Sequence, residues 1–282
     1  MAINNTPPPN EERLKLLLAN GCIDVVKQLI EQHKLPLKLD DKGNLVDSIA
    51  GTELWLQRFL TADPETIQLK SDITQLSKTE DEVLIMGETG TGKELLARAL
   101  IGSREGKSVA VNCAGLPENL IESELFGHRR GSFTGADSDK QGLMSAAKNG
   151  ILFLDEVGEL PISVQGKLLR ALQDKVIRRV GGNNEEEVNC KFVFATNRDI
   201  AAMVKVGAFR QDLYARISTF ELHVKPIRSR KCDIEPIILS MNKGPAFYEK
   251  HSLKLHDGTL SLEHNVRSLQ QHVRRWVVLG RV

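Results

Sequence analysis

The sequence has no marked excess of charge of either sign. Its 38 lysines and arginines against 37 aspartates and glutamates leave a formal net charge of +1. A protein that binds nucleic acid mainly through bulk charge carries a pronounced basic field. The balance of charge therefore argues against nucleic-acid binding of that kind.

Long apolar runs are also missing. No stretch approaches the roughly 20 consecutive apolar residues needed to cross a bilayer. The segment Met1 to Asn10 is polar and proline-rich, and it lacks the apolar centre of a signal peptide. We therefore expect no membrane association, and we expect Met1 to Asn10 to be a disordered leader.

Cysteine is scarce and scattered. The four cysteines include no C-x-x-C pair, and they stand at Cys22, Cys113, Cys190 and Cys232. This spacing argues against a zinc site or a disulfide framework and fits a reducing cytoplasm. We expect four buried thiols and a cytoplasmic protein.

Beyond about residue 49 the chain alternates short apolar runs with helical periodicity. Strands are expected at residues 83–86, 109–111, 151–154 and 192–195. Helices are expected at residues 94–100, 164–173, 233–241 and 262–279. Short buried strands between helices predict an α/β fold with a parallel sheet covered on both faces.

The ends of the chain follow other patterns. Residues 11–33 show helical periodicity interrupted at Asn20-Gly21, and residues 35–46 fit a short β-hairpin. We divide the chain into three parts, an N-terminal appendage (1–47), an α/β core (48–223) and a helical lid (224–282). The stretch between Met241 and Leu260 is short, which predicts a reduced lid.

A glycine-rich loop follows the first apolar run of the core. The segment Gly87-Glu88-Thr89-Gly90-Thr91-Gly92-Lys93 fits G-x-x-x-x-G-K between a strand and a helix, which is the setting of a phosphate-binding loop. Glycines allow backbone N–H groups to close around phosphate oxygens, and Lys93 can reach the β- and γ-phosphates. The next residue is Glu94, where the motif usually has a serine or threonine whose hydroxyl binds magnesium.

A pair of carboxylates supplies the expected partner of this loop. The apolar run 151–154 ends in Asp155-Glu156, at the end of the strand where α/β sheets bind ligands. Asp155 can hold Mg²⁺ directly or through water, and Glu156 can polarise the water that attacks the γ-phosphate. The polar pair Thr196-Asn197 ends a neighbouring run and can contact the phosphate or the water, although asparagine is also common in turns.

Between these two signals lies a third. In Gly131-Ser132-Phe133-Thr134-Gly135-Ala136, glycines bracket a phenylalanine and a threonine within a polar stretch. This pattern predicts a mobile loop with an apolar tip. Placed between the two nucleotide signals, the tip is a candidate contact with the target of a motor.

Together the motifs resemble the AAA+ ATPase domain of the sigma-54-dependent transcriptional activators. The resemblance runs from about residue 49 to residue 279, and in that family the phosphate loop also ends in a glutamate, as at Glu94. The hexapeptide 131–136 matches the family signature G-A-F-T-G-A with serine in place of alanine. Further matching segments are Asn112-Cys113-Ala114, residues 122–128, 165–173, 179–182 and 209–216.

The resemblance implies a role for each matching position. Phe133, Thr134 and Gly135 would contact sigma-54 from a loop spanning residues 127–137 when ATP is bound. Asn112 would hold Glu156 away from water until the partner engages. The remaining roles are a first sensor at Asn197, a second sensor at Arg267 and arginine fingers at Arg210 and Arg216.

Without the resemblance, several of these residues have plainer explanations. Arg210 and Arg216 could form surface ion pairs, Arg267 could face solvent and Asn112 could cap a turn. The family's W-P-G-N is replaced by Leu262-Glu263-His264-Asn265, which puts the direction of Arg267 in doubt. No helix-turn-helix follows the lid, so direct DNA binding is not expected.

The resemblance thus predicts an ATPase that uses ATP and Mg²⁺ to remodel the sigma-54 RNA polymerase holoenzyme. Fingers acting in trans imply self-association into a ring, expected to be a hexamer. Two alternatives stay open. One is a regulatory subunit or sigma-54 antagonist without productive turnover, and the other is an AAA+ motor turned to another protein target.

Overall fold

The computed structural model describes residues 23–32, 37–39, 45–47, 51–102, 104 and 106–281. At its centre is a five-stranded sheet in which every pairing is parallel. In chain order the strands are β3 (Val83–Met86), β4 (Ser108–Asn112), β7 (Ile151–Asp155), β10 (Lys191–Thr196) and β11 (Phe220–His223). Their spatial order is β11-β3-β10-β7-β4, with β10 inserted between β3 and β7.

Alternation along the strands divides the core into two clusters. Leu84 of β3 and Leu152 of β7 join one cluster, whereas their neighbours Ile85 and Phe153 join the other. Successive side chains of a strand point to opposite faces of a sheet, so a sheet buried on both sides needs apolar residues throughout. This confirms the predicted α/β fold with helices on both faces.

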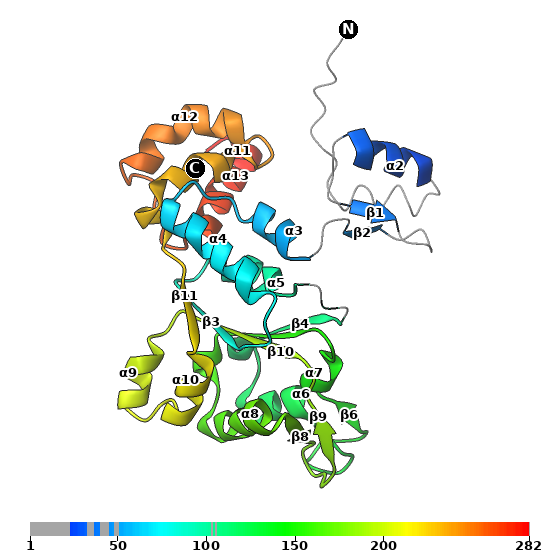
Figure 1. Ribbon diagram of the computed structural model, residues 1–282. Helices are drawn as coiled ribbons and strands as arrows, with labels where there is room; N and C mark the ends of the chain where they lie inside the picture. The colour runs from blue at the N-terminus through cyan, green and yellow to red at the C-terminus, as the bar shows by residue number, and fades with distance from the viewer. Residues whose placement is uncertain are drawn as a thin grey trace.

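Helices cover the two faces unequally (Figure 1). One face is covered by α3 (Gly51–Arg58), α4 (Pro64–Leu76) and α5 (Lys93–Ala99). The other is covered by a larger group, which consists of α6 (Glu118–Phe126), α7 (Leu143–Ala146), α8 (Ile162–Asp174), α9 (Ile200–Lys205) and α10 (Gln211–Ile217).

Two small hairpins lie beyond α6 and α8 (Figure 1). The first pairs β5 (Gly127–His128) with β6 (Lys140–Gln141), and the second pairs β8 (Val176–Arg178) with β9 (Glu185–Glu187). A parallel bridge between His128 and Val180 joins them. The sequence patterns had predicted neither hairpin.

After β11 the chain becomes helical, with α11 (Ile234–Leu239), α12 (Gly244–His256) and α13 (Val266–Leu279) around a separate hydrophobic cluster. The stretch between Met241 and Leu260, from which a reduced lid was predicted, is mostly helical, because α12 occupies it. The size of the lid relative to the family stays a prediction. The buried residues of α12 are Gly244, Phe247, His251 and Leu255, and the last three are spaced four apart on one face.

Near the N-terminus the structure describes α2 (Ile23–Gln32) and an antiparallel pair of β1 (Leu37–Leu39) with β2 (Leu45–Asp47). The expected hairpin is therefore present as a strand pair, while the leader, the Asn20-Gly21 break and Cys22 lie outside the described residues. Cys113 and Cys190 are buried free thiols as expected, but Cys232 is exposed. Within the described ranges, no helix has the length and apolar character to cross a membrane.

Candidate functional site

The glycine-rich loop runs from the end of β3 to the start of α5. Gly90 and Gly92 have φ angles of 78° and 103°, which favour glycine. A Cβ on Gly90 would lie 2.2 Å from the carbonyl oxygen of His264, and one on Gly92 would lie 2.7 Å from the ring of Phe59. Any larger residue would therefore collide with the lid or with the segment before α4.

Lys93 turns its side chain back into this loop. Its Nζ donates to the carbonyl oxygens of Gly87 at 2.7 Å and Glu88 at 3.2 Å. Burial lowers the pKa of Lys93, and the Glu156 and Asp155 carboxylates oppose that shift. The ammonium group is thus placed over the loop, facing the two carboxylates that were predicted to work with it.

Asp155 and Glu156 stand at the carboxyl end of β7. Burial raises the pKa of Asp155, while Lys93 and the backbone N–H of Glu156 act in the opposite direction. Glu156 has φ 53° and ψ 51°, a left-handed conformation that is uncommon for a non-glycine residue. This turn directs Glu156 away from the strand and toward the end of β10.

Asn197 connects Glu156 to the phosphate loop. Its backbone N–H donates to Glu156 Oε2 at 3.1 Å, and its side-chain Nδ2 donates to Thr89 Oγ1 at 3.0 Å. The position is the one predicted for the first sensor. Thr196 beside it is buried, and its hydroxyl accepts the N–H of Arg198 at 3.0 Å.

These side chains surround one cavity of about 230 Å³. Its lining joins the phosphate loop, the end of β7 and the start of α13, and it includes Lys93, Glu94, Asp155, Glu156 and Arg267. Arg267 therefore faces the site even though the family's proline and glycine are absent. Asn265 accounts for this, because it adopts a positive φ of 54° immediately before α13.

An adjoining apolar cavity of about 150 Å³ was not predicted. It shares Gly92, Leu95, Val266 and Gln270 with the first cavity. The rest of its lining comes from the segment before α4, the phosphate loop and the lid, namely Arg58, Phe59, Leu60, Thr91, Arg230, Ile237, Ser240 and Met241. Such a pocket could hold a planar base beside a phosphate site. No linear motif identifies it, because three distant segments build it.

Asn112 lies close to the carboxylates without bonding to Glu156. It is the register partner of Asp155 across β4 and β7. Its Oδ1 accepts the N–H of Ala114 at 2.9 Å and so caps a short 3-10 turn, Cys113–Gly115. In this structure Glu156 bonds to Asn197 instead, and the switch role of Asn112 stays a prediction.

Arg210 and Arg216 are not among the residues that line either cavity. Arg210 makes two hydrogen bonds to Asp212, at 3.0 and 2.6 Å. Arg216 lies 3.2 Å from the buried carboxylate of Glu82, just before β3 and at the edge of the sheet opposite the phosphate loop. The structure thus separates both arginines from the chain's own site.

The contact loop lies between β5 and β6. Phe133 is 37% exposed, and its ring meets the ring of His128 edge-on at 5.0 Å between centroids. Two backbone bonds shape the tip, from Gly131 N–H to Ala136 O and from Ala136 N–H to Phe133 O. Thr134 and Gly135 are exposed. The predicted apolar tip is present, and its phenylalanine is exposed although its ring packs against His128.

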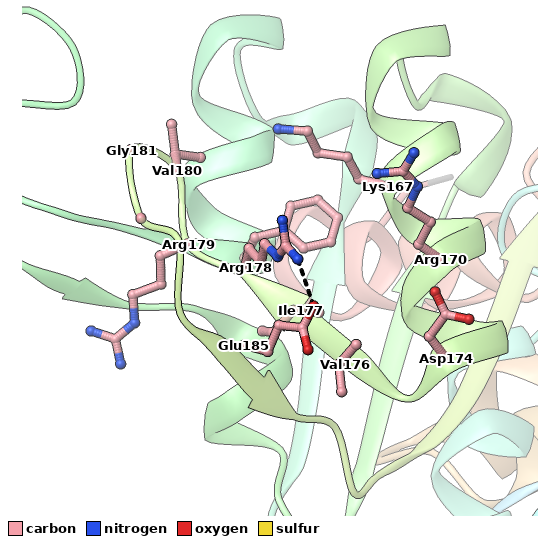
Figure 2. Close-up of a pocket in the computed structure, with 12 residues that line it drawn as sticks. Lys167, Arg170, Asp174, Val176, Ile177, Arg178, Arg179, Val180, Gly181 and Glu185 are labelled. Atoms are coloured by element: carbon pink, nitrogen blue, oxygen red, sulfur yellow. Dashed lines mark hydrogen bonds and ion pairs between the residues drawn. The ribbon is translucent and has the colours of Figure 1, made fainter.

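The second hairpin supports this loop from behind. Arg129 donates its N–H to Val180 O at 3.0 Å, and Val180 returns a bond to Gly127 O at 2.9 Å. Behind the hairpin lies a cavity of about 420 Å³ between α8 and β8–β9. Figure 2 shows Lys167, Arg170 and Asp174 along α8, facing the Arg178–Glu185 ion pair of the hairpin.

The site fits a magnesium nucleotide better than a metal held by protein alone. Among the described residues, no group of three or more histidine, cysteine, aspartate or glutamate side chains could hold a metal ion. Mg²⁺ characteristically takes one or two protein carboxylates and completes its shell with substrate phosphates and water. Asp155 is placed to supply that carboxylate, and Lys93 and Arg267 supply charge for the phosphates.

The strand order, the phosphate loop after β3 and the carboxylates after β7 define an AAA+ fold. The chain belongs to the sigma-54 interaction domain family, whose model matches residues 59–223. It is 50% identical over 235 residues to the response regulator protein PilR of Pseudomonas aeruginosa, covering 78% of this chain and 53% of PilR. It is 48% identical over 211 residues to the regulatory protein AtoC of Escherichia coli, covering 73% of this chain and 46% of AtoC.

Solved structures agree with this assignment. NtrX from Brucella abortus superposes with a TM-score of 0.69 at 27% identity, covering 97% of this chain and 59% of that chain. Hsp104 in its closed state with ATPγS and casein gives 0.54 at 19% identity, over 76% of this chain and 44% of that chain, which shows the fold alone. The chain spans about half the length of the curated relatives it matches.

Proposed function

We propose that this chain is an ATP-hydrolysing remodeller of the sigma-54 RNA polymerase holoenzyme and acts in transcription regulation. One observation carries the proposal. Lys93, Asp155, Glu156 and Arg267 line a single cavity, while Phe133 is exposed on a separate loop. An ATP site and an apolar contact tip on one chain are what a motor with a protein target requires.

The relatives support the two halves of this proposal separately. NtrX was solved in complex with ATP and in complex with ADP, and it aligns with 93% or more of this chain. NorR of Escherichia coli, a transcription regulator, is 39% identical over 273 residues, covering 94% of this chain and 51% of NorR. The family model concerns interaction with sigma-54.

The chemistry follows from the positions of the side chains. Lys93 and Arg267 would offset the charge of the β- and γ-phosphates. Asp155 would hold Mg²⁺, and that ion would supply further positive charge for the phosphates. Glu156 accepts a proton as water attacks the γ-phosphorus and the bond to the β,γ-bridging oxygen breaks. Asn197 orients Glu156 through its backbone N–H. Its side chain bonds to Thr89, so a movement of the phosphate loop would also move Asn197.

Arg210 and Arg216 enter the proposal as fingers for the site of a neighbouring copy. Their distance from the chain's own cavity supports action in trans, and trans action requires a ring, proposed to be a hexamer. The three-part organisation, with an appendage at 1–47, a core at 48–223 and a lid at 224–282, is supported by the separate hydrophobic cluster of the lid.

ATPase turnover of the purified protein tests the catalytic half. Glu156→Gln keeps the side chain's size and removes its basicity, so turnover should fall at least about 100-fold while nucleotide binding is retained. Glu249→Gln, an exposed carboxylate on α12, is the matched control and should leave turnover unchanged. Absence of turnover in the wild type, with and without sigma-54, would favour the non-productive regulatory subunit.

Sigma-54 binding tests the other half. In the presence of ADP and a metal fluoride that mimics the transferring phosphate, Phe133→Ala should lose sigma-54 binding but retain ATPase activity. Phe220→Ala is the control, because Phe220 is also 37% exposed but lies on β11, away from the loop. Turnover without any sigma-54 binding by the wild type would favour a motor with another target.

A further inference from the structure

The phosphate loop contains a carboxylate that does not line the nucleotide cavity. Glu88 follows Gly87 directly, yet its side chain points to the lid and is absent from the cavity lining. Arg228 donates to both oxygens of this carboxylate, at 2.7 and 2.5 Å. Arg228 belongs to a short 3-10 turn, Ile227–Ser229, at the start of the lid.

Asn265 holds the same carboxylate from a second direction. It is fully buried, and its Nδ2 lies 3.2 Å from Glu88 Oε2 and 3.1 Å from the carbonyl oxygen of Thr89. Its Oδ1 accepts the N–H of Ile227 at 2.7 Å, which ties it to the turn carrying Arg228. Val266, the next residue, donates its N–H to Gly90 O at 3.1 Å.

These contacts address an electrostatic problem. A carboxylate in a loop that binds phosphate repels the anion it should receive. The Glu88 side chain is 41% exposed, so this repulsion acts through partly accessible solvent and is weakened by salt. A bidentate pair with an arginine cancels the charge and fixes its direction. The hydrogen bonds from Arg228 and then from Asn265 lower the pKa of Glu88 to about 2, so the carboxylate is ionised at neutral pH and its charge has to be offset.

We propose that Arg228 is a positioning residue for nucleotide binding, which neutralises Glu88 and holds its carboxylate against the lid. The inference rests on the proposed function, because it takes the cavity beside Lys93 to be the nucleotide site. It adds a residue from outside that cavity. It also gives the lid a direct effect on nucleotide affinity, because losing the lid contact would free a negative charge next to the phosphates.

A double-mutant cycle tests this with a fluorescent ATP analogue. Arg228→Gln should weaken binding of the analogue about tenfold at low ionic strength, which is a typical size for the coupling between two residues in contact. The loss of affinity should be smaller at high salt, because salt screens the repulsion between Glu88 and the phosphates. Glu88→Gln in the Arg228→Gln background should restore most of the affinity, since the unpaired charge is gone. Lys231→Gln removes a nearby exposed lid cation and should stay within about twofold of wild type.

The outcomes separate the possibilities. A double variant that binds as weakly as Arg228→Gln alone would overturn the proposal, because Arg228 would then act through packing. Unchanged affinity in Arg228→Gln would overturn it as well. Thermal unfolding and the amide exchange of Val266, both measured without nucleotide, show whether the variants remain folded with the lid in contact with the loop. If the wild type binds no nucleotide, the proposed function itself fails. If the wild type binds nucleotide and Arg228→Gln binds it equally well, only the role of Arg228 fails.

Discussion

At the scale of single residues, Ser132 carries a buried hydroxyl without a hydrogen-bond partner among the described residues. Gly181 of the second hairpin packs against it, and a Cβ there would lie 2.5 Å from the Ser132 Cβ. A buried polar group without a partner costs roughly 1–3 kcal/mol. We expect Ser132→Ala to raise the free energy of unfolding by about 1 kcal/mol in urea denaturation. Ser138 is exposed on the same loop, so Ser138→Ala should leave the free energy of unfolding unchanged. A lower free energy of unfolding in Ser132→Ala would show that the Ser132 hydroxyl has a hydrogen-bond partner.

Lys191 predicts a dependence of stability on pH. Its Nζ is buried and donates to the carbonyl oxygens of Leu76 and Thr79, at 2.6 and 2.8 Å. Burial, with a smaller effect from Arg104, lowers the pKa of Lys191 to about 8 from 10.5. Between these two pH values the unfolded chain binds more protons than the folded one, so the free energy of unfolding should rise with pH, by up to about 3 kcal/mol.

The measurement compares urea unfolding of the wild type and Lys191→Met from pH 7.5 to 10. Other groups also titrate in this interval, so the difference between the two proteins is the readout. Lys205→Met removes an exposed lysine, so its free energy of unfolding should change with pH at the same slope as that of the wild type. Equal slopes for wild type and Lys191→Met would contradict the prediction.

The grouping of the candidate site residues could be predicted from the sequence where a strand positions them. Lys93, Asp155 and Asn197 each follow closely on an apolar run, and the carboxyl ends of neighbouring parallel strands converge on one edge. Arg228 could not be predicted, because its contact with Glu88 joins residues 140 positions apart and depends on how the lid docks. Neither spacing nor periodicity encodes that contact.

At the scale of elements, His128 adds a ring contact and a side-chain hydrogen bond to the backbone bonds that hold the contact loop. His128 packs against Phe133, and its Nδ1 lies 2.6 Å from Ser123 Oγ on α6. An aromatic pair contributes about 0.5–1.5 kcal/mol beyond its buried area, which corresponds to a roughly two- to twelvefold change in an opening equilibrium. We expect His128→Ala to speed amide exchange at Ala136, whose N–H bonds to Phe133 O, by such a factor.

Hydrogen exchange of the peptide covering residues 131–137 measures this opening. Ser123→Ala keeps the aromatic contact and loses only the bond that orients the imidazole, so its effect should be intermediate. Exchange in α13, which belongs to the hydrophobic cluster of the lid, serves as the internal reference. Unchanged exchange at the tip in His128→Ala would mean that backbone bonds alone hold the loop.

Strands that are buried on both faces could be predicted from the sequence more accurately than exposed ones. β3 was predicted at its observed bounds and β7 and β10 to within a residue, because strands buried on both faces are continuous apolar runs. β9 consists of Glu185–Glu187 and carries no apolar signal, so only its pairing with β8 makes it a strand. α12 begins at Gly244-Pro245, a pair that resembles a turn although proline is also favoured in the first turn of a helix.

At the scale of the whole molecule, the two candidate fingers are engaged away from the chain's own site. Arg216 shares the buried Glu82 with Lys175, each at 3.2 Å, and Arg210 is paired with Asp212. Both arginines keep substantial exposure, with 41% and 42% of their side chains accessible. The exposed parts of both side chains are therefore accessible to a neighbouring surface. A partner's site is a target that no single-chain sequence pattern could reveal, and the family resemblance alone suggested it.

Mixing two inactive variants tests this arrangement. Arg216→Ala retains Glu156 but lacks the finger, whereas Glu156→Gln retains the finger but lacks the base, so each alone should lose most turnover. In an equal mixture, a site is complete when an Arg216→Ala subunit has a Glu156→Gln subunit supplying its finger.

Random assembly creates such sites about a quarter of the time, so turnover should return to about a quarter of the wild-type value if sites act independently. A finger acting within its own chain would give no recovery at any mixing ratio, because no subunit would then hold both groups. The same mixture made with Arg210→Ala shows which of the two arginines completes the site.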